Sequence, residues 1–145
     1  MALMNWLYLF NGFHGRISRQ TFWLASGILI LAELVAGFLA EQIQGDRLAA
    51  IVDLAFTYPE FAVAIKRLHD RNLPIWLLVF FFGGAALTDL FSLLGVESGD
   101  DSPSMLLLAV EVPVAVLGLV LLVELGFRRG TVGPNPNGPD PLAKI

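Results

Sequence analysis

The chain has 145 residues, 56% of them hydrophobic and only 15% charged, with a formal net charge of −4 and no cysteine. Because soluble domains carry about 25% charged residues, this composition argues against a soluble domain, and the lack of cysteine excludes disulfides and thiolate metal sites. Acidic residues dominate one set of loops and basic residues the other, a pattern that gives no support to nucleic-acid binding, which requires a continuous basic surface.

The first two elements in chain order are a short apolar segment and a long one. Residues 1–13 are too few to cross a bilayer, but Trp6 and Tyr8 suit a position at headgroup depth. Ser18 is a suitable N-cap for a helix over residues 20–40. Since one crossing needs about 20 apolar residues, we expect an interfacial segment followed by the first transmembrane helix.

Three further apolar stretches predict three more transmembrane helices, over residues 48–65, 74–95 and 105–127. The stretch that follows the polar turn at residues 41–47 is the least hydrophobic, because it contains Asp53, Pro59 and Glu60. Residues 128–145 are rich in Pro, Gly and Asn and predict an irregular tail. The expected fold is an all-α membrane protein, in which residues 1–145 form one four-helix bundle.

Eight of the nine Lys and Arg residues lie in three short polar segments, which are residues 16–19, 66–71 and 128–144. If each apolar stretch crosses the bilayer once, all three segments lie on one face. The positive-inside rule makes that face cytoplasmic, together with both termini. The loop over residues 96–104 is acidic and contains no base, as expected on the opposite side.

Each basic segment carries a motif: GRISRQTFW over residues 15–23, KRLHD with a Trp six positions later over residues 66–76, and a Gly-x-x-Gly-x-Asn run ending in GPDP over residues 130–141. Together these motifs resemble those of the DUF805 family of small bacterial inner-membrane proteins. The resemblance implies four spans in the inner (plasma) membrane and no established biochemical activity. Lys66 stands where that family usually has arginine.

The basic segments favour two interpretations. One is an interfacial charge lock that fixes topology, in which Lys66, Arg67 and Arg71 bind the last carbonyls of the second span or lipid phosphates. The other is a specific site for an anionic headgroup, because arginine recognises phosphate with paired hydrogen bonds. The candidate residues for that site are Arg16, Arg19, Arg67, His69, Asp70, Arg71, Asn135 and Asp140.

Three local expectations follow from side-chain chemistry. Asn72 tolerates the left-handed backbone conformation with which a helix ends, so we expect it there at the end of the second span. Glu124 and Arg128 are four residues apart and should pair on one helix face. Asp140 either docks the tail against the basic loops or belongs to a disordered tail.

Catalytic motifs are missing from the chain. The adjacent His69 and Asp70 suggest a metal hydrolase, but His14 is the only other histidine, and no His-x-x-x-His or cysteine pair completes a ligand set. Neither a Gly-x-Ser-x-Gly nucleophile motif nor a P-loop occurs. We therefore expect no enzymatic activity, no metal and no cofactor.

Acidic residues within the predicted spans suggest a second kind of site, since intramembrane carboxylates are costly. These residues are Glu33, Asp53, Glu60, Asp89 and Glu111. All except Glu60 lie roughly 8–10 Å below the outer boundary if a helix rises about 1.5 Å per residue. Facing the bundle axis, they would form a ring for a cation or for shared protons, with Glu60 deeper.

The sequence predicts a non-enzymatic inner-membrane protein that binds lipid headgroups or a protein partner through its Arg-rich cytoplasmic face, either alone or as a homo-oligomer. The alternative is a cation or proton conductor, or a transporter subunit, that uses the intramembrane acids. These two functions use opposite halves of the bundle, so the positions of the side chains decide between them.

Overall fold

A computed structural model describes residues 6–44, 46–94 and 105–143. These residues form five α-helices and one π-helical turn, without a strand. The elements are α1 (Trp6–Asn11), α2 (Arg19–Gln44), α3 (Asp46–Arg71), α4 (Trp76–Leu93), α5 (Met105–Leu121) and η1 (Leu122–Phe127). The predicted all-α fold, with a short N-terminal segment and an irregular tail, is confirmed.

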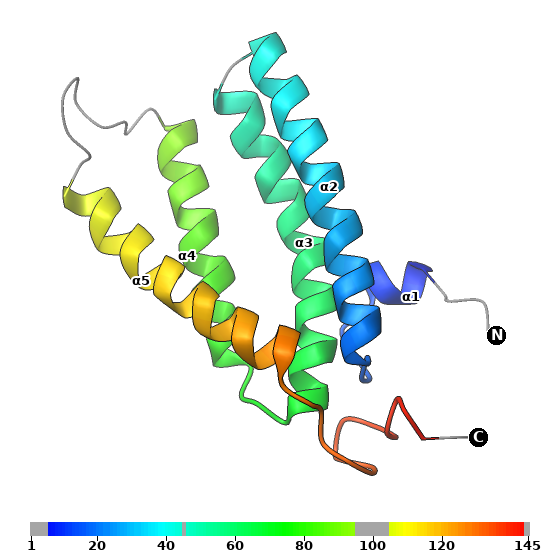
Figure 1. Cartoon of the computed structure of the whole chain (residues 1–145). Coiled ribbons are helices and arrows are strands. Elements are labelled where there is room, and N and C mark those ends of the chain that lie inside the picture. The colour runs from blue at the N-terminus through cyan, green and yellow to red at the C-terminus, as the bar shows by residue number, and fades with distance from the viewer. Residues whose placement is uncertain (1–5, 45, 95–104, 144–145) are drawn as a thin grey trace.

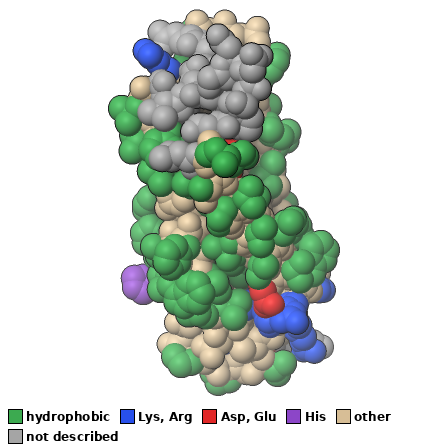
Figure 2. Space-filling view, turned by 90° about the vertical axis from the view of Figure 1, so that its left-hand side faces the viewer, with side chains coloured by type: hydrophobic (Ala, Val, Ile, Leu, Met, Phe, Trp, Pro, Cys, Tyr) green, Lys and Arg blue, Asp and Glu red, His purple; other side chains and the backbone are tan. Residues whose placement is uncertain are grey.

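Three helices are long and apolar enough to cross a membrane, over Arg19–Ile43, Arg47–Arg71 and Leu107–Phe127. The fourth apolar helix, Trp76–Phe91, is shorter. Figure 2 shows one face of the molecule, where hydrophobic side chains cover the middle and most visible Lys and Arg side chains gather toward the lower end. The chain is therefore an α-helical membrane protein.

The second span is longer than the predicted range of 48–65. The α3 helix continues through the whole Lys66–Arg71 segment and contains Pro59 in its interior. It ends where expected, because Asn72 has a φ of 53° and the amide of Leu73 donates to the carbonyl of Leu68, a bond typical of a left-handed helix end. The predicted turn at 41–47 is largely helical, since α2 reaches Gln44 and α3 begins at Asp46.

Neighbouring helices in the chain pack side by side, α2 on α3, α3 on α4 and α4 on α5. The α2–α3 pair and the α4–α5 pair converge at one end and diverge toward the other (Figure 1). The core lies at the convergent end, where Ala25, Leu29, Leu68, Leu78 and Leu125 belong to one buried cluster. We call this the basic end, because the basic segments of residues 16–19, 66–71 and 128–129 meet there.

Glycines allow two close helix contacts near the basic end. A Cβ atom on Gly118 of α5 would lie 2.8 Å from the ring of Phe81 on α4, and one on Gly126 of η1 would lie 2.7 Å from the indole of Trp23 on α2. Both values are shorter than a normal carbon–carbon contact. Only glycine therefore lets α5 and η1 approach their neighbours this closely.

Candidate functional site

Side chains from α2 and α3 donate to five consecutive carbonyls at the end of the last span. The pairs are Arg67 Nε to Leu125 (2.8 Å), Trp23 Nε1 to Gly126 (2.8 Å), Arg19 Nη1 to Phe127 (3.0 Å), Arg67 Nη2 to Arg128 (2.6 Å) and Arg71 Nη1 to Arg129. A helix leaves its last carbonyls without intrahelical partners, and cations are favourable at this negative end of the dipole. The two upstream motifs therefore cap the fourth span.

A buried ion triad lies beside this cap. Arg16 donates to Asp70 Oδ1 through Nε (3.0 Å) and Nη2 (2.7 Å), and Arg67 Nη1 donates to Asp70 Oδ2. The exposed fractions are 8% for Arg16, 1% for Arg67 and 3% for Asp70. A buried charge is tolerated only when it is paired and hydrogen-bonded, and these three residues, which we call the clamp, meet that condition.

The clamp holds the tail through its backbone. Arg16 donates to three tail carbonyls, those of Thr131 (2.6 Å), Gly133 (2.8 Å) and Gly138 (3.2 Å). The backbone amide and the hydroxyl of Thr131 both donate to the carbonyl of Asp70, at 2.8 and 2.9 Å. Gly130 lies so close to the Asp70 carboxylate that a Cβ atom would overlap it. Residues 130–138 of the tail are therefore held against the basic end.

Asn135 and Asp140 shape the tail itself. Asn135 Nδ2 donates to the carbonyl of His69 at 3.0 Å. Asp140 accepts from the backbone amides of Gly133 and Leu142, each at 2.9 Å, and these bonds hold the pKa of its carboxyl below the usual value. Asp140 thus closes a turn within the tail, and Arg16 and Arg129 act on its carboxyl electrostatically.

Lys66 and His69 tie the N-terminal segment to α3. The Lys66 ammonium donates to the carbonyl of Gly12 and lies 5.2 Å from the centre of the Tyr8 ring. His69 Nδ1 lies 3.1 Å from the carbonyl oxygen of Gly15. These contacts explain why both side chains sit within the protein, and no group of three metal-ligating side chains occurs among the described residues.

The charge-lock interpretation predicted that the basic side chains of α3 bind the last carbonyls of their own helix. In the structure they bind carbonyls of other segments. Arg67 and Arg71 bind carbonyls of the last span, and Lys66 binds the N-terminal segment. Arg71 also pairs with Glu124 at 2.9 Å, and Arg128 pairs with the same carboxylate at 2.7 Å, as its spacing predicts. The last carbonyls of α3 instead accept from other donors, since Asn135 donates to His69 and Thr131 donates to Asp70.

A cavity of about 360 Å³ lies between the start of α2, the end of α3 and the tail. Its lining residues are Ser18, Arg19, Arg67, Asp70, Arg129, Gly130, Thr131, Val132, Asp140, Pro141 and Leu142. Arg19 and Arg129 are exposed, and neither forms an ion pair within the described residues. Arg19 keeps one hydrogen bond to the carbonyl of Phe127, and Arg129 acts on Asp140 electrostatically, so two guanidinium groups outside any ion pair border this cavity.

The structure redistributes the candidate anion-binding residues. Arg16 and Arg67 are buried and occupied by Asp70 and by carbonyls, so Arg19 is the candidate with an exposed guanidinium at the cavity. Arg129 and Ser18 join it, although the sequence did not single them out for this role. The only sign of this role in the sequence is that Arg129 belongs to the third basic segment. Because Arg129 is far from α2 in the chain, the sequence does not show that both line one cavity.

Four of the five intramembrane acids come together between α2, α3 and α4. The carboxyls of Glu33 and Glu60 lie close together, and Asp53 and Asp89 act on Glu33 electrostatically. Glu111 on α5 is exposed and takes no part in this cluster, so the predicted ring of four acids at one depth does not form.

Comparison with known proteins agrees with the sequence motifs. Residues 10–139 match the family described as "Protein of unknown function (DUF805)". The chain is 31% identical to "Uncharacterized protein YiiR" of Escherichia coli strain K12 over 144 residues, which cover 97% of this chain and 90% of the relative. The protein of the same description from Escherichia coli O157:H7 matches equally. No solved structure matches.

Proposed function

This chain belongs to the DUF805 family, and we propose that it is a non-enzymatic inner-membrane protein that binds the phosphate of an anionic lipid at its basic end. The observation that carries the proposal is the cavity beside the tail, which is lined by the exposed Arg19 and Arg129, neither of which forms an ion pair within the described residues. Arginine offers a planar set of donors that matches phosphate geometry. Ser18 adds a hydroxyl to the same lining.

Charge within the cavity supports an anionic ligand. The negative charge of Asp70 is compensated by Arg16 and Arg67, and the carboxylate of Asp140 is engaged by two backbone amides. Arg19 uses Nη1 on the carbonyl of Phe127, which fixes the guanidinium and leaves its other donors available. The lining contains neither histidine nor cysteine, which favours binding over catalysis.

The membrane setting supports a lipid as the source of the phosphate. Arg19 begins α2, and η1 ends at Phe127, so Arg19 and Arg129 lie at helix ends, where phospholipid headgroups are found. Eight of the nine basic residues lie on the same side if the spans alternate, and the positive-inside rule then makes that side cytoplasmic. Anionic lipids of the cytoplasmic leaflet attract basic segments next to spans.

The test compares wild-type protein with the double variant Arg19→Gln/Arg129→Gln in neutral detergent. Adding phosphatidylglycerol should raise the thermal midpoint of the wild type more than phosphatidylcholine does, because a ligand at 100 times its Kd stabilises the bound state by about 2.7 kcal/mol. The double variant should lose this difference. Inorganic phosphate as a second ligand separates recognition of phosphate from recognition of the whole lipid.

Arg128→Gln is the matched control for this test. Arg128 neighbours Arg129 and is exposed, but it pairs with Glu124 and does not line the cavity. Its variant removes the same kind of charge and should keep the phosphatidylglycerol effect. A double variant that responds to phosphatidylglycerol like the wild type would contradict the proposal.

A second candidate function is proton or cation movement through the acidic cluster. The proximity of the Glu33 and Glu60 carboxyls within the spans favours it, because neighbouring intramembrane carboxyls are typical of proton and ion pathways. Purified protein in vesicles with a trapped pH dye should acidify the lumen under an imposed potential. Glu33→Gln/Glu60→Gln should abolish the flux and Glu111→Gln should not, whereas flux no faster than that of empty vesicles would exclude this function.

A further inference from the structure

A second cavity, of about 190 Å³, lies in the membrane-spanning part of the bundle and shares no lining residue with the cavity at the tail. Its walls come from α2, α3, α4, α5 and η1. The lining residues are Phe22, Trp23, Ser26, Ile30, Glu60, Ala64, Leu78, Phe81, Phe82, Gly118, Leu121, Leu122 and Leu125. Glu60 is the only charged side chain among them, and Ser26 is the only other polar one.

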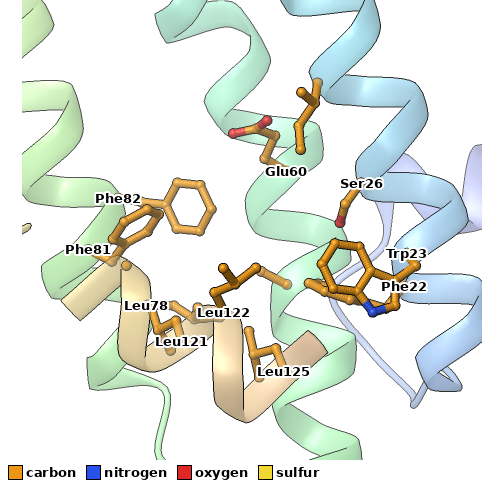
Figure 3. Close-up of a pocket in the computed structure, with 13 residues that line it drawn as sticks. Phe22, Trp23, Ser26, Glu60, Leu78, Phe81, Phe82, Leu121, Leu122 and Leu125 are labelled. Atoms are coloured by element: carbon orange, nitrogen blue, oxygen red, sulfur yellow. The ribbon is translucent and has the colours of Figure 1, made fainter. Parts of the chain in front are cut away.

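Aromatic rings form two opposite walls of this cavity. Figure 3 shows Phe81 and Phe82 on one side, Phe22 and Trp23 on the other, and Glu60 above the space between them. The Phe81 and Phe82 rings meet edge to face with centroids 5.1 Å apart, and the Phe22 and Trp23 rings do so at 5.9 Å. The two rings of each pair are inclined steeply to one another. A ligand in the cavity can therefore contact ring faces as well as ring edges.

Contacts with η1 hold the indole of Trp23 in place. Its indole N–H donates to the carbonyl of Gly126 at 2.8 Å, and Gly126 leaves just enough room for the ring. Below this contact, Arg19 binds Phe127, so the α2–η1 seam separates the two cavities. Above it, α2 packs on α3 and α5 packs on α4, and the two pairs diverge (Figure 1).

The cavity contains the carboxyl group of Glu60, which forms no ion pair with a basic residue in the part of the chain that the structure describes. Residues 20–46, 48–65 and 72–127 contain no lysine and only acidic charged residues. Glu60 has Glu33 as its carboxyl partner, and Asp53 adds a further acid nearby. In an apolar setting a carboxylate favours a cation strongly, and aromatic ring faces attract cations as well.

From this arrangement we infer that the cavity binds a small organic cation with an apolar substituent, such as an aryl ammonium compound, with its charge at Glu60 and its apolar part between the aromatic pairs. A plain hydrocarbon chain would fill the same volume but would leave the charge of Glu60 uncompensated. An inorganic cation would compensate the charge but would leave the aromatic walls unused. Only a ligand with both parts uses the whole lining.

The experiment measures binding of radiolabelled phenyltrimethylammonium to detergent-purified full-length protein by equilibrium dialysis. tert-Butylbenzene, which has the same shape without the charge, serves as the competitor. The wild type should bind the cation saturably and resist displacement by an equal concentration of the neutral compound. Glu60→Gln should weaken binding by about tenfold or more, as loss of one well-placed charge contact does.

Three variants complete the design. Phe81→Leu keeps the cavity apolar but removes one ring, so it should weaken cation binding by several-fold. Glu111→Gln removes an exposed acid outside the cavity and should leave binding unchanged. Arg19→Gln/Arg129→Gln should also bind the cation normally, which keeps this inference separate from the proposed lipid site.

Two results would overturn the inference. One is equal binding of the cation and its neutral isostere by the wild type, which would identify the cavity as a hydrocarbon site. The other is a Glu60→Gln variant with the same far-ultraviolet circular dichroism as the wild type and undiminished cation binding. If Glu60→Gln does not fold, the wild-type preference for the charged compound and the Phe81→Leu result decide the question.

Discussion

Replacing Asp70 with asparagine should destabilise the whole basic end, because Asp70 is the shared acceptor of the clamp. Its carboxylate receives two hydrogen bonds from Arg16 and one from Arg67, and the side chains of these ion pairs are 1% and 4% exposed. Asparagine keeps one carbonyl acceptor but removes the negative charge. Two buried guanidinium groups are then left without a counter-ion.

The expected loss is about 3–5 kcal/mol in the free energy of unfolding, which is the usual cost of breaking a buried ion pair. Solvent screening does not reduce this value much, because Asp70 is buried. The lost hydrogen bonds lead to a similar value. Hydrogen bonds to charged groups contribute about 1.5–3 kcal/mol each, and asparagine retains some of the three bonds that Asp70 accepts. The tail should also be released, because Arg16 loses its fixed position.

Unfolding in mixed micelles with increasing denaturing detergent, followed by tryptophan fluorescence, measures the first effect. Trypsin cleavage after Arg128 and Arg129 measures release of the tail and should become faster. Glu124→Gln is the control, since Glu124 also pairs with two arginines but its side chain is 20% exposed, so about 1 kcal/mol or less is expected. If Asp70→Asn costs no more than Glu124→Gln, the clamp does not stabilise the fold as we have reasoned.

Two further predictions concern helix packing and the tail. Gly84→Ala should weaken the α4–α5 contact, since its Cβ would overlap the Val114 side chain. The control Gly83→Ala meets open space and should be neutral or stabilise the protein by about 0.5–1 kcal/mol. Equal thermal midpoints of the two variants would contradict this prediction. The lowered pKa of Asp140 means that its contribution to tail order is complete above the ordinary aspartate pKa of about 3.9 and is lost as the pH falls through the lowered value. An NMR titration of the tail amides should therefore have its midpoint below that ordinary value, and Asp140→Asn should remove this transition. A midpoint at or above the ordinary aspartate pKa would refute the role of Asp140 in ordering the tail.

The sequence predicted three local features in which the interacting residues are close together in the chain. Ser18 caps α2, because its hydroxyl accepts from the amide of Thr21 at 3.2 Å. Asn72 has the left-handed conformation expected at the end of α3. Glu124 and Arg128 pair across one helical turn. In each case the backbone geometry of a helix or its end brings the partners together without help from another element.

The sequence did not predict the contacts between residues that are far apart in the chain. Arg16 and Asp70 are 54 positions apart, and Arg16 and Gly138 are 122 apart. The sequence indicated that their segments share a membrane face, but the burial of Arg16 and Arg67 depends on how the tail folds back over them. The π-helical end of the last span, which directs its carbonyls toward Arg19, Trp23 and Arg67, also has no signature in the apolar pattern.

By itself, the sequence determined that this protein is helical, enters the membrane and collects its basic residues at one end, because hydrophobicity and charge are properties of each segment alone. The tertiary structure decided which arginines remain available, because a guanidinium that pairs with Asp70 and caps carbonyls cannot also bind a ligand. It likewise separated Glu111 from the other acids and placed Glu60 in the lining of a cavity whose walls carry aromatic rings of α2 and α4. Those outcomes depend on helix rotation and on the divergence of the two helix pairs, which packing across the whole bundle determines.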